Sequence, residues 1–401
     1  MKITAIETHL MQVGARPSGG AALGVDADFR GSRNWLFVRV LTDEGLHGVG
    51  ECSGWPRVVE RAVQDLANVL VGEDPQHVDR LWHRMQLAMM GHGMLGTVAG
   101  GAMSGIEMAL WDIKGKALGQ PVWNLLGGRF RDCIQVYGHA RTPQRAAELI
   151  ERGYRGFKVP FTGAVDLDIV ADIRTAIGDE RDLMVDAHGP SWMTTQDAIL
   201  VGRELEAFDL LFYEDPVPPE NLDALARLRD SVNVPLAAGE RVATIHGMRP
   251  YIERDLVDVI QPDTGRAGGI TQMRKMAAMA EAHGIMMAPH SGSLGPVAEF
   301  AALHVMATIP NALMLERVEF DWPGRYEVVR PVLKVVDGRL PVPDAPGLGV
   351  DIIEGEIVRY PGIRNVAELP PDDGWANEPG TRDEALYIQT RLSRRRKLRR
   401  R

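Results

Sequence analysis

Apolar and polar positions in the first part of the chain alternate as they do in strands, and then change to helical spacing. Residues 3–13 alternate with a period of two, and two strand-like runs within 34–51 flank the turn Asp43-Glu44-Gly45, which predicts a hairpin. Apolar residues then recur at helical intervals in three stretches, 57–72, 75–90 and 96–118. Strands followed by helices are typical of an α+β domain, which we predict over residues 1–128.

From about residue 133 short apolar runs alternate with amphipathic helical stretches. The expected strands are residues 134–140, 156–160, 182–187, 211–216, 235–240, 257–263, 285–290 and 312–318. The expected helices include residues 168–177, 195–207, 221–232, 270–283 and 296–307. No Gly-rich phosphate or dinucleotide fingerprint follows any of these strands, so a closed parallel barrel explains the series better than an open sheet. The glycines of residues 100–105 have no preceding strand and indicate close helix packing instead.

These patterns predict an α/β fold in which a (β/α)7β TIM-like barrel covers residues 129–330. After residue 330 the chain is rich in Pro and Gly, with strand-like pieces at 327–335 and 352–359. We expect residues 331–401 to return to the N-terminal domain, so that both ends of the chain build one α+β capping domain. Residues 361–401 are expected to be peripheral or poorly ordered.

Composition and charge narrow the function classes. The chain of 401 residues carries a net charge of −9, and its last eleven residues carry eight cations, so the remainder carries −17. An acidic body argues against a broad nucleic-acid surface, and the basic tail is expected to be a disordered, solvated end. No stretch is apolar enough to span a membrane. Cys52 and Cys133 are too few for a disulfide framework, and we expect both to be small buried residues of a cytoplasmic protein.

Ionisable side chains stand at the ends of seven of the eight predicted barrel strands. In strand order they are Lys158, Asp186 with His188, Glu214, Glu240, Asp263, His290 and Glu316. From Asp186 onward they recur every 23 to 28 residues, which is one βα unit. Because active sites of such barrels lie at the carboxyl ends of the strands, we expect these groups to converge on one mouth.

Three of these residues, Asp186, Glu214 and Glu240, are carboxylates on consecutive strands. Like charges at close range resist ionisation, and a hard divalent cation removes that repulsion. Oxygen ligands favour Mg²⁺. The sequence therefore predicts a magnesium site built from these three side chains, with His188 as an alternative ligand.

Asp263 and His290 end neighbouring strands and can form a carboxylate–imidazole dyad. The carboxylate would orient the ring and stabilise its cationic form, so we expect His290 to act as a base. His188 projects from the same side of its strand as Asp186, because residues two apart share a face, and it suits an acid or base beside a metal-bound substrate. Glu316 could hydrogen-bond a substrate oxygen or a developing enolate.

As a set, these residues resemble the enolase superfamily, in its mandelate racemase/muconate lactonizing enzyme branch. The resemblance extends to about residue 360. Its motifs are the stretch Gly105–Pro121 of the capping domain, Asp186, Tyr213-Glu-Asp-Pro216, Ala238-Gly-Glu240, Gln261-Pro-Asp263 and Ala288-Pro-His290. The resemblance implies Mg²⁺-assisted abstraction of the proton α to a carboxylate, which gives a metal-stabilised enediolate.

One departure from the family pattern separates its subgroups. Racemase and lactonizing members carry Lys-x-Lys at the end of the second strand, whereas this chain has Lys158-Val-Pro160, which removes the second lysine. With His188 present, the chain is most similar to the galactonate dehydratase-type sugar-acid dehydratases. That similarity implies that His290 takes the C2 proton, that His188 protonates the departing C3 hydroxyl, and that Lys158 binds the substrate carboxylate.

The predicted function is an Mg²⁺-dependent acid-sugar (aldonate) dehydratase, a carbon–oxygen lyase that forms a 2-keto-3-deoxy acid. Two alternatives stay open: an epimerase or lactone cycloisomerase acting on an aldonate or aldarate through His290 and Lys158, and a catalytically silent sugar-acid binding protein. Two loops, 14–33 with Arg30 and 52–57 with Trp55, are expected to contact the substrate. The expected partners are a small sugar acid and further copies of the chain in a homo-oligomer, without nucleic acid or membrane.

Overall fold

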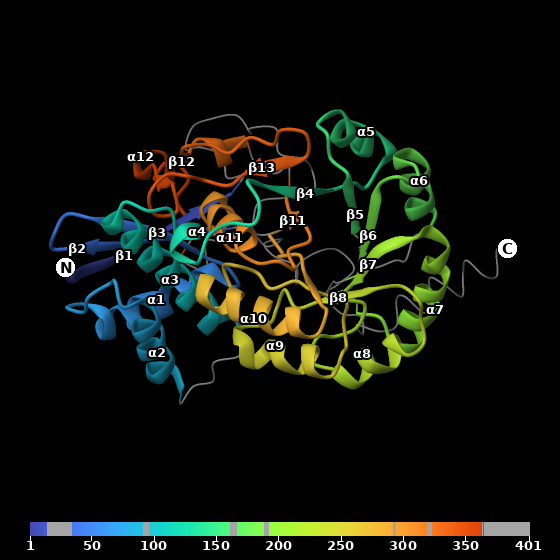
Figure 1. Ribbon diagram of the computed structural model, residues 1–401, viewed down its shortest axis with the longest axis horizontal. Helices are drawn as coiled ribbons and strands as arrows, with labels where there is room; N and C mark the ends of the chain where they lie inside the picture. The colour runs from blue at the N-terminus through green and yellow to red at the C-terminus, as the bar shows by residue number, and fades with distance from the viewer. Residues whose placement is uncertain are drawn as a thin grey trace.

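A computed structural model describes residues 1–13, 34–90, 96–160, 167–187, 192–291, 294–318, 323–362 and 364. An α+β capping domain lies beside a parallel barrel, and the C-terminal strands lie over the junction between them (Figure 1). Among the described residues, helices of the length and apolarity needed to cross a bilayer do not occur.

The capping domain is built on an antiparallel sheet in the order β1-β2-β3. Its strands are β1 (Ile3–Gln12), β2 (Asn34–Thr42) and β3 (His47–Cys52), so the predicted hairpin within 34–51 is confirmed. Its helices are α1 (Pro56–Leu70), α2 (Val78–Met89), α3 (Thr97–Leu118) and the short α4 (Val122–Leu125). The first three correspond to the three predicted helices.

Small residues let α3 approach its neighbours closely, as predicted for residues 100–105. A Cβ atom on Gly100 would lie 2.1 Å from the carbonyl oxygen of Arg266, and one on Gly105 would lie 2.3 Å from Sγ of Cys52. Both distances are shorter than any side chain tolerates. Cys52 is a buried free thiol at this contact, as expected, whereas Cys133 is a free thiol that is only half-buried.

Among the described residues, the barrel has eight parallel strands with seven helices between them. The strands are β4 (Cys133–His139), β5 (Gly156–Pro160), β6 (Asp182–Asp186), β7 (Leu210–Glu214), β8 (Leu236–Ala238), β9 (Val259–Ile260), β10 (Met286–Met287) and β11 (Leu315–Glu316). The helices are α5 (Pro143–Glu151), α6 (Leu167–Ile177), α7 (Thr195–Leu205), α8 (Leu222–Arg229), α9 (Thr244–Glu253), α10 (Ile270–Ala282) and α11 (Pro296–Ala307). β11 pairs with β4, and Ala312 bridges to Met287 of β10. The predicted (β/α)7β order is confirmed.

Side chains fill the interior of the barrel. One inward layer combines Tyr137, Met184, Phe212 and Val259 from different strands with Met314, and all are buried. The rings of Tyr137 and Phe212 meet edge to face with centroids 6.2 Å apart. The barrel is therefore a packed core, as is general for this architecture, and chemistry is confined to its mouth.

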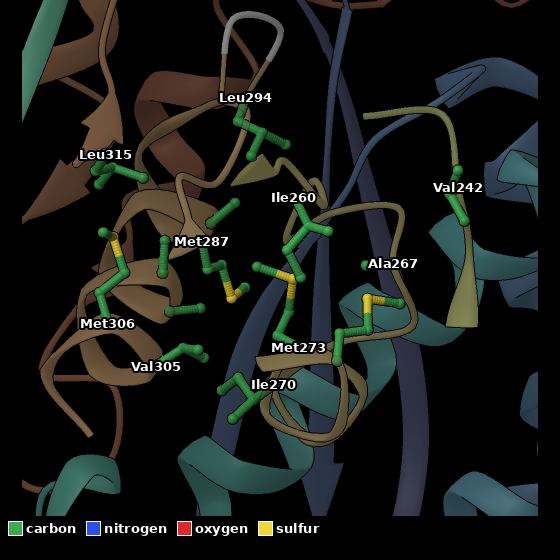
Figure 2. Close-up of a cluster of buried hydrophobic side chains, with 14 of the residues drawn as sticks. Val242, Ile260, Ala267, Ile270, Met273, Met287, Leu294, Val305, Met306 and Leu315 are labelled. Carbon is green, nitrogen blue, oxygen red and sulfur yellow. The ribbon is translucent and has the colours of Figure 1, made fainter. Parts of the chain in front are cut away.

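A second apolar layer joins the outer face of the strands to the helices. Figure 2 shows Ile260 and Met287, from β9 and β10, pointing toward Ile270 and Met273 of α10, with Met306 of α11 nearby. Residues of one strand thus alternate between the interior and the helix layer. This double burial explains the short, continuous apolar runs in the sequence.

Several strands end earlier than predicted. The strand expected over 257–263 is hydrogen-bonded as β9 only at Val259–Ile260, and that expected over 285–290 only at Met286–Met287. Beyond these points the backbone leaves the sheet to turn toward the next helix. Asp263 and His290 therefore lie in loops at the mouth rather than on strands.

The C-terminal segment contacts both parts of the molecule. β13 (Arg339–Pro341) pairs antiparallel with β4, while β12 (Val329–Arg330) pairs with β14 (Asp351–Ile352). The piece predicted as strand-like over 352–359 is a strand only at its first residue and then forms a helical turn, α12 (Glu354–Ile357). Beyond residue 360, only 361, 362 and 364 are described, so the predicted basic tail lies outside the described residues.

Two buried carboxylates of the capping domain hold the N-termini of barrel helices. Glu107 of α3 accepts hydrogen bonds from the backbone N–H groups of Ile270 (2.7 Å) and Thr271 (2.9 Å), where α10 begins. Glu51 of β3 accepts from Ala298 (3.0 Å) and from Gly295, where α11 begins. The residues preceding both helices are glycines without a capping side chain, so the capping domain supplies the missing acceptors.

Burial raises the pKa of Glu107 to about 7 and that of Glu51 to about 7. Between about pH 4.3, the ordinary pKa of a glutamate, and about pH 7, these two side chains hold protons in the folded protein that they lose in the unfolded chain. The free energy of unfolding therefore falls as the pH rises through this interval. We expect the free energy of unfolding of Glu107→Gln to decrease less over this pH interval than that of the wild type, by up to about 3 kcal/mol. Urea unfolding midpoints of both proteins at pH 5, 6 and 7 measure this difference.

The exposed Glu180 offers a matched control, because Glu180→Gln should leave the pH slope unchanged. An identical slope in wild type and Glu107→Gln would contradict the pKa assigned to Glu107.

Candidate functional site

Three neighbouring strands place ionisable side chains at the barrel mouth. Lys158 lies on β5, and Asp186 and Glu214 are the last residues of β6 and β7. Asp186 and Glu214 are register partners across the two strands. All three side chains are buried.

The ammonium group of Lys158 lies at the centre of the cluster. Its Nζ is 2.9 Å from Oδ2 of Asp186, 2.9 Å from Oε2 of Glu214 and 2.5 Å from Oε1 of Glu316. Burial acts to lower the pKa of Lys158, but the three carboxylates outweigh it and hold the pKa well above its ordinary value. The lysine is therefore a permanent cation in this arrangement.

One ammonium group does not balance the negative charge around it. Burial, and then repulsion by Asp186, raise the pKa of Glu214 to about 8 despite the nearby Lys158. Its Oε1 atom is buried and accepts no hydrogen bond from the described residues. The cluster is thus short of positive charge at Glu214.

Glu240, the third predicted carboxylate, lies two residues beyond β8. The chain turns there through Gly239, whose φ of 123° is accessible mainly to glycine. Oε1 of Glu240 is 2.8 Å from the guanidinium of Arg241, which also donates a hydrogen bond to Asp215 at 2.8 Å. Oε2 of Glu240 lies 3.1 Å from Nε2 of His290.

Asp263 and His290 are in direct contact. Nδ1 of His290 is 2.8 Å from Oδ2 of Asp263, whose other oxygen accepts the backbone N–H of Gly265 at 2.8 Å. Burial lowers the pKa of His290, but Glu240, Glu316 and Asp263 together raise it above the ordinary value. With Nδ1–H donated to Asp263, Nε2 carries the lone pair of the neutral ring.

Glu316, at the end of β11, connects two histidines. Its Oε2 accepts the backbone N–H of Ser291 at 2.7 Å, next to His290, and its Oε1 lies 2.7 Å from Nε2 of His139. Burial opposes ionisation, yet Lys158, His290 and His139 hold the pKa of Glu316 well below its usual range. Glu316 is therefore an ionised hydrogen-bond acceptor.

His139 was not among the predicted site residues. It is the last residue of the first barrel strand, the one strand for which no terminal side chain was considered. The rule applied to the other seven strands would have found it.

The capping domain reaches this mouth through Ser53. Its backbone N–H donates to the carbonyl of Gly265 (2.9 Å), and its Oγ accepts from Nε of Arg266 (3.1 Å). Nε of Arg266 also lies 3.4 Å from Oδ2 of Asp263. Trp55, predicted to contact substrate, is 60% exposed beyond this contact. Arg30 and His188 lie outside the described residues.

Comparisons with known proteins agree on one family. Residues 23–127 match the N-terminal domain of the mandelate racemase/muconate lactonizing enzymes, and residues 141–356 match the enolase C-terminal domain-like family. The chain belongs to this branch of the enolase superfamily. It is therefore an enzyme of that superfamily, and the resemblance seen in the sequence is confirmed.

Relatives with two different activities have similar sequence identity to this chain. D-galactarolactone cycloisomerase of Agrobacterium fabrum is 36% identical over 90% of this chain and 99% of its own. D-galactonate dehydratase of Xanthomonas oryzae pv. oryzae is 37% identical over 87% of this chain and 94% of its own. The crystal structure of the 3,6-anhydro-D-galactonate cycloisomerase from Zobellia galactanivorans superimposes with a TM-score of 0.80, at 30% identity, over 90% of this chain and 99% of that one.

Enzymes of this branch typically depend on a divalent metal ion, and the donor chemistry of the mouth fits one. Within the described residues, no three Asp, Glu, His or Cys side chains lie close enough to hold an ion as they stand. Lys158 and Arg241 instead contact the three carboxylates predicted as its ligands. Oε1 of Glu214, buried without a hydrogen-bond donor among the described residues, is the atom that most needs a cation.

We expect Lys158→Met to lower the free energy of unfolding by about 3 to 5 kcal/mol in the presence of a chelator, because it leaves buried carboxylates without their cation. Mg²⁺ should then stabilise the variant more than the wild-type enzyme, since Lys158 and the metal neutralise the same groups. Urea unfolding with EDTA and with Mg²⁺ measures both effects.

Lys275→Met is the matched control, because Lys275 is half exposed and its ammonium lies 3.7 Å from Asp79 at the surface, where an ion pair contributes little. Equal stabilisation of Lys158→Met and wild type by Mg²⁺ would show that the metal does not bind at this cluster.

Proposed function

We propose that this enzyme is a divalent-metal-dependent sugar-acid dehydratase. It removes the C2 proton and the C3 hydroxyl of an aldonate as water, and the resulting enol becomes a 2-keto-3-deoxy acid. The observation that carries the proposal is the buried Asp263–His290 pair beside the carboxylates and Lys158. His290 is thus a proposed base that lies beside the proposed cation ligands and the Lys158 ammonium group.

His290 is the proposed base for the C2 proton. Asp263 accepts Nδ1–H at 2.8 Å and so leaves the Nε2 lone pair available in the neutral ring. Once Nε2 has taken the proton, Asp263, Glu240 and Glu316 stabilise the imidazolium. The same carboxylates therefore orient the base and favour the proton transfer.

His188 is the proposed acid for the leaving group. A hydroxyl leaves C3 as water only if it gains a proton, because hydroxide is a poor leaving group at neutral pH. His188 follows Asp186 by two residues in the sequence, the spacing at which residues of a strand share a face. The electron pair of the broken C2–H bond is first delocalised into the substrate carboxylate, and it forms the C2–C3 double bond when the C3–O bond breaks in a second step.

Asp186, Glu214 and Glu240 are the proposed ligands of the cation, with Mg²⁺ as the ion that an all-oxygen set favours. When bound, the ion supplies positive charge where the substrate carboxylate gains negative charge. Lys158 is then the proposed partner of the substrate carboxylate, at the position where it now contacts Asp186 and Glu316.

A lactone cycloisomerase is the second candidate. The cycloisomerase of Agrobacterium is about as similar to this chain, at 36% identity, as the dehydratase is at 37%, and the cycloisomerase of Zobellia is 30% identical. In that reaction His290 and Lys158 would move protons without loss of water. Pro160, which replaces the second lysine of the Lys-x-Lys pattern, and the Asp186-Ala-His188 sequence favour the dehydratase.

Incubation of the purified enzyme with Mg²⁺ and a panel of aldonates and aldarolactones distinguishes the dehydratase from the lactone cycloisomerase. A dehydratase should form a product lighter by one water that reacts with semicarbazide. A cycloisomerase should form an isomer of unchanged mass. Sedimentation of the same preparation tests the predicted homo-oligomer.

On the accepted aldonate, we expect His290→Asn to lower both C2 deuterium exchange and dehydration by about 100-fold to 10,000-fold, the usual contribution of a general base. His188→Asn should stop dehydration but retain exchange at C2, because the base is intact. Proton NMR in deuterium oxide and the semicarbazide assay follow the two steps separately.

His246→Asn, at an exposed position on α9, controls for nonspecific effects of removing an imidazole. Dehydration at the wild-type rate in His188→Asn would refute the role of His188, and exchange retained in His290→Asn would refute that of His290.

A further inference from the structure

His139 lies between two residues of the site. β4 is flanked by β5 and β11, with His139 in register with Lys158 of β5 and in contact with Glu316 of β11. Tyr137, two residues earlier on the same strand, belongs to the inward layer of the barrel. Because residues two apart on a strand share a face, His139 lies above this layer, at the mouth.

The contact with Glu316 determines which ring nitrogen carries the proton. Glu316 is paired with Lys158 at 2.5 Å and accepts an N–H from Ser291, so its oxygens act as acceptors. The bond of 2.7 Å to His139 is therefore donated by Nε2–H. Burial lowers the pKa of His139, which favours the neutral ring, and a neutral ring protonated at Nε2 has its lone pair on Nδ1.

The side chain of His139 is partly accessible. The side chain of His139 is 26% exposed, whereas those of Lys158 and Glu316 are 1% exposed. Nε2 contacts the buried carboxylate of Glu316. Among the described residues, Nδ1 has no hydrogen-bond partner. A partly exposed residue at the mouth of the barrel thus carries an acceptor that no described residue occupies.

We propose that His139 is a specificity-determining residue whose Nδ1 accepts a hydrogen bond from a hydroxyl group of the substrate. The proposal rests on the sugar-acid function proposed above, because such substrates carry a hydroxyl on nearly every carbon. Glu316 positions the ring by holding Nε2–H. A site built to pair with a hydroxyl rejects an analogue that lacks it.

Two amide variants separate recognition of the substrate from support of Glu316. In His139→Gln, the amide nitrogen of the new side chain can replace Nε2 as the donor to Glu316, but no acceptor remains at the position of Nδ1. In His139→Asn, the shorter side chain reaches the position of Nδ1, where its oxygen can accept, but it does not reach Glu316. His139→Gln therefore removes the acceptor for the substrate hydroxyl, and His139→Asn removes the hydrogen bond to Glu316.

The experiment compares kcat/KM for the accepted aldonate with that for its monodeoxy analogues, which lack one hydroxyl other than the one at C3. For one analogue, His139→Gln should reduce the wild-type preference for the parent substrate by about tenfold to 100-fold, mainly through KM. His139→Asn should retain most of that preference while lowering kcat. Each ratio is taken within one variant, so a partly unfolded preparation does not alter it.

Unchanged preference in His139→Gln for every analogue would overturn the proposal, and a loss of kcat in His139→Asn alone would assign His139 to positioning only. Failure of the proposed function is distinct, because the wild-type enzyme would then convert no aldonate and form no keto acid. That result would overturn the role of His139 as well.

Discussion

The buried negative charge at the barrel mouth is the constraint on which the site depends. Asp186, Glu214 and Glu316 surround one ammonium group, that of Lys158, and Glu214 is raised to a pKa of about 8 by burial and by Asp186. Buried carboxylates are costly unless they are paired. The barrel can hold them so close together only because its strands are in fixed register and its interior is packed. A divalent cation and a substrate-binding lysine would together supply the positive charge that these carboxylates need.

The capping domain depends on the same electrostatic principle. Glu51 and Glu107 are buried carboxylates, and each accepts backbone N–H groups at the start of a barrel helix, where the helix dipole favours negative charge. These contacts position β3 and α3 against α10 and α11. Ser53 follows directly and meets Arg266, beside Asp263. The capping domain is thus joined to the loop that carries Asp263 of the predicted dyad.

Much of the architecture follows from periodicity. Strand and helix spacing predicted the hairpin, the eight strands and the barrel order, because residues buried on both faces of a parallel sheet form short apolar runs. The C-terminal piece at 352–359 was less predictable, since short segments that pack on other elements take their conformation from those contacts. His139 was missed although it stands at a strand end like the other site residues, and its significance becomes visible only through its contact with Glu316.

By itself, the sequence determined which chemical groups reach the mouth. A regular interval of one βα unit brings every strand end to the same side of the barrel, so Asp186, Glu214, Asp263 and His290 could be placed there from spacing alone. The Asp263–His290 pair also followed from strand order, but only the tertiary structure decided the other pairs: Lys158 with Asp186 and Glu214, Glu240 with Arg241, and His139 with Glu316. The reason is physical, because pairing depends on distances of a few ångströms and on burial between residues far apart in the chain. The local pattern of apolar and polar residues gives neither these distances nor this burial.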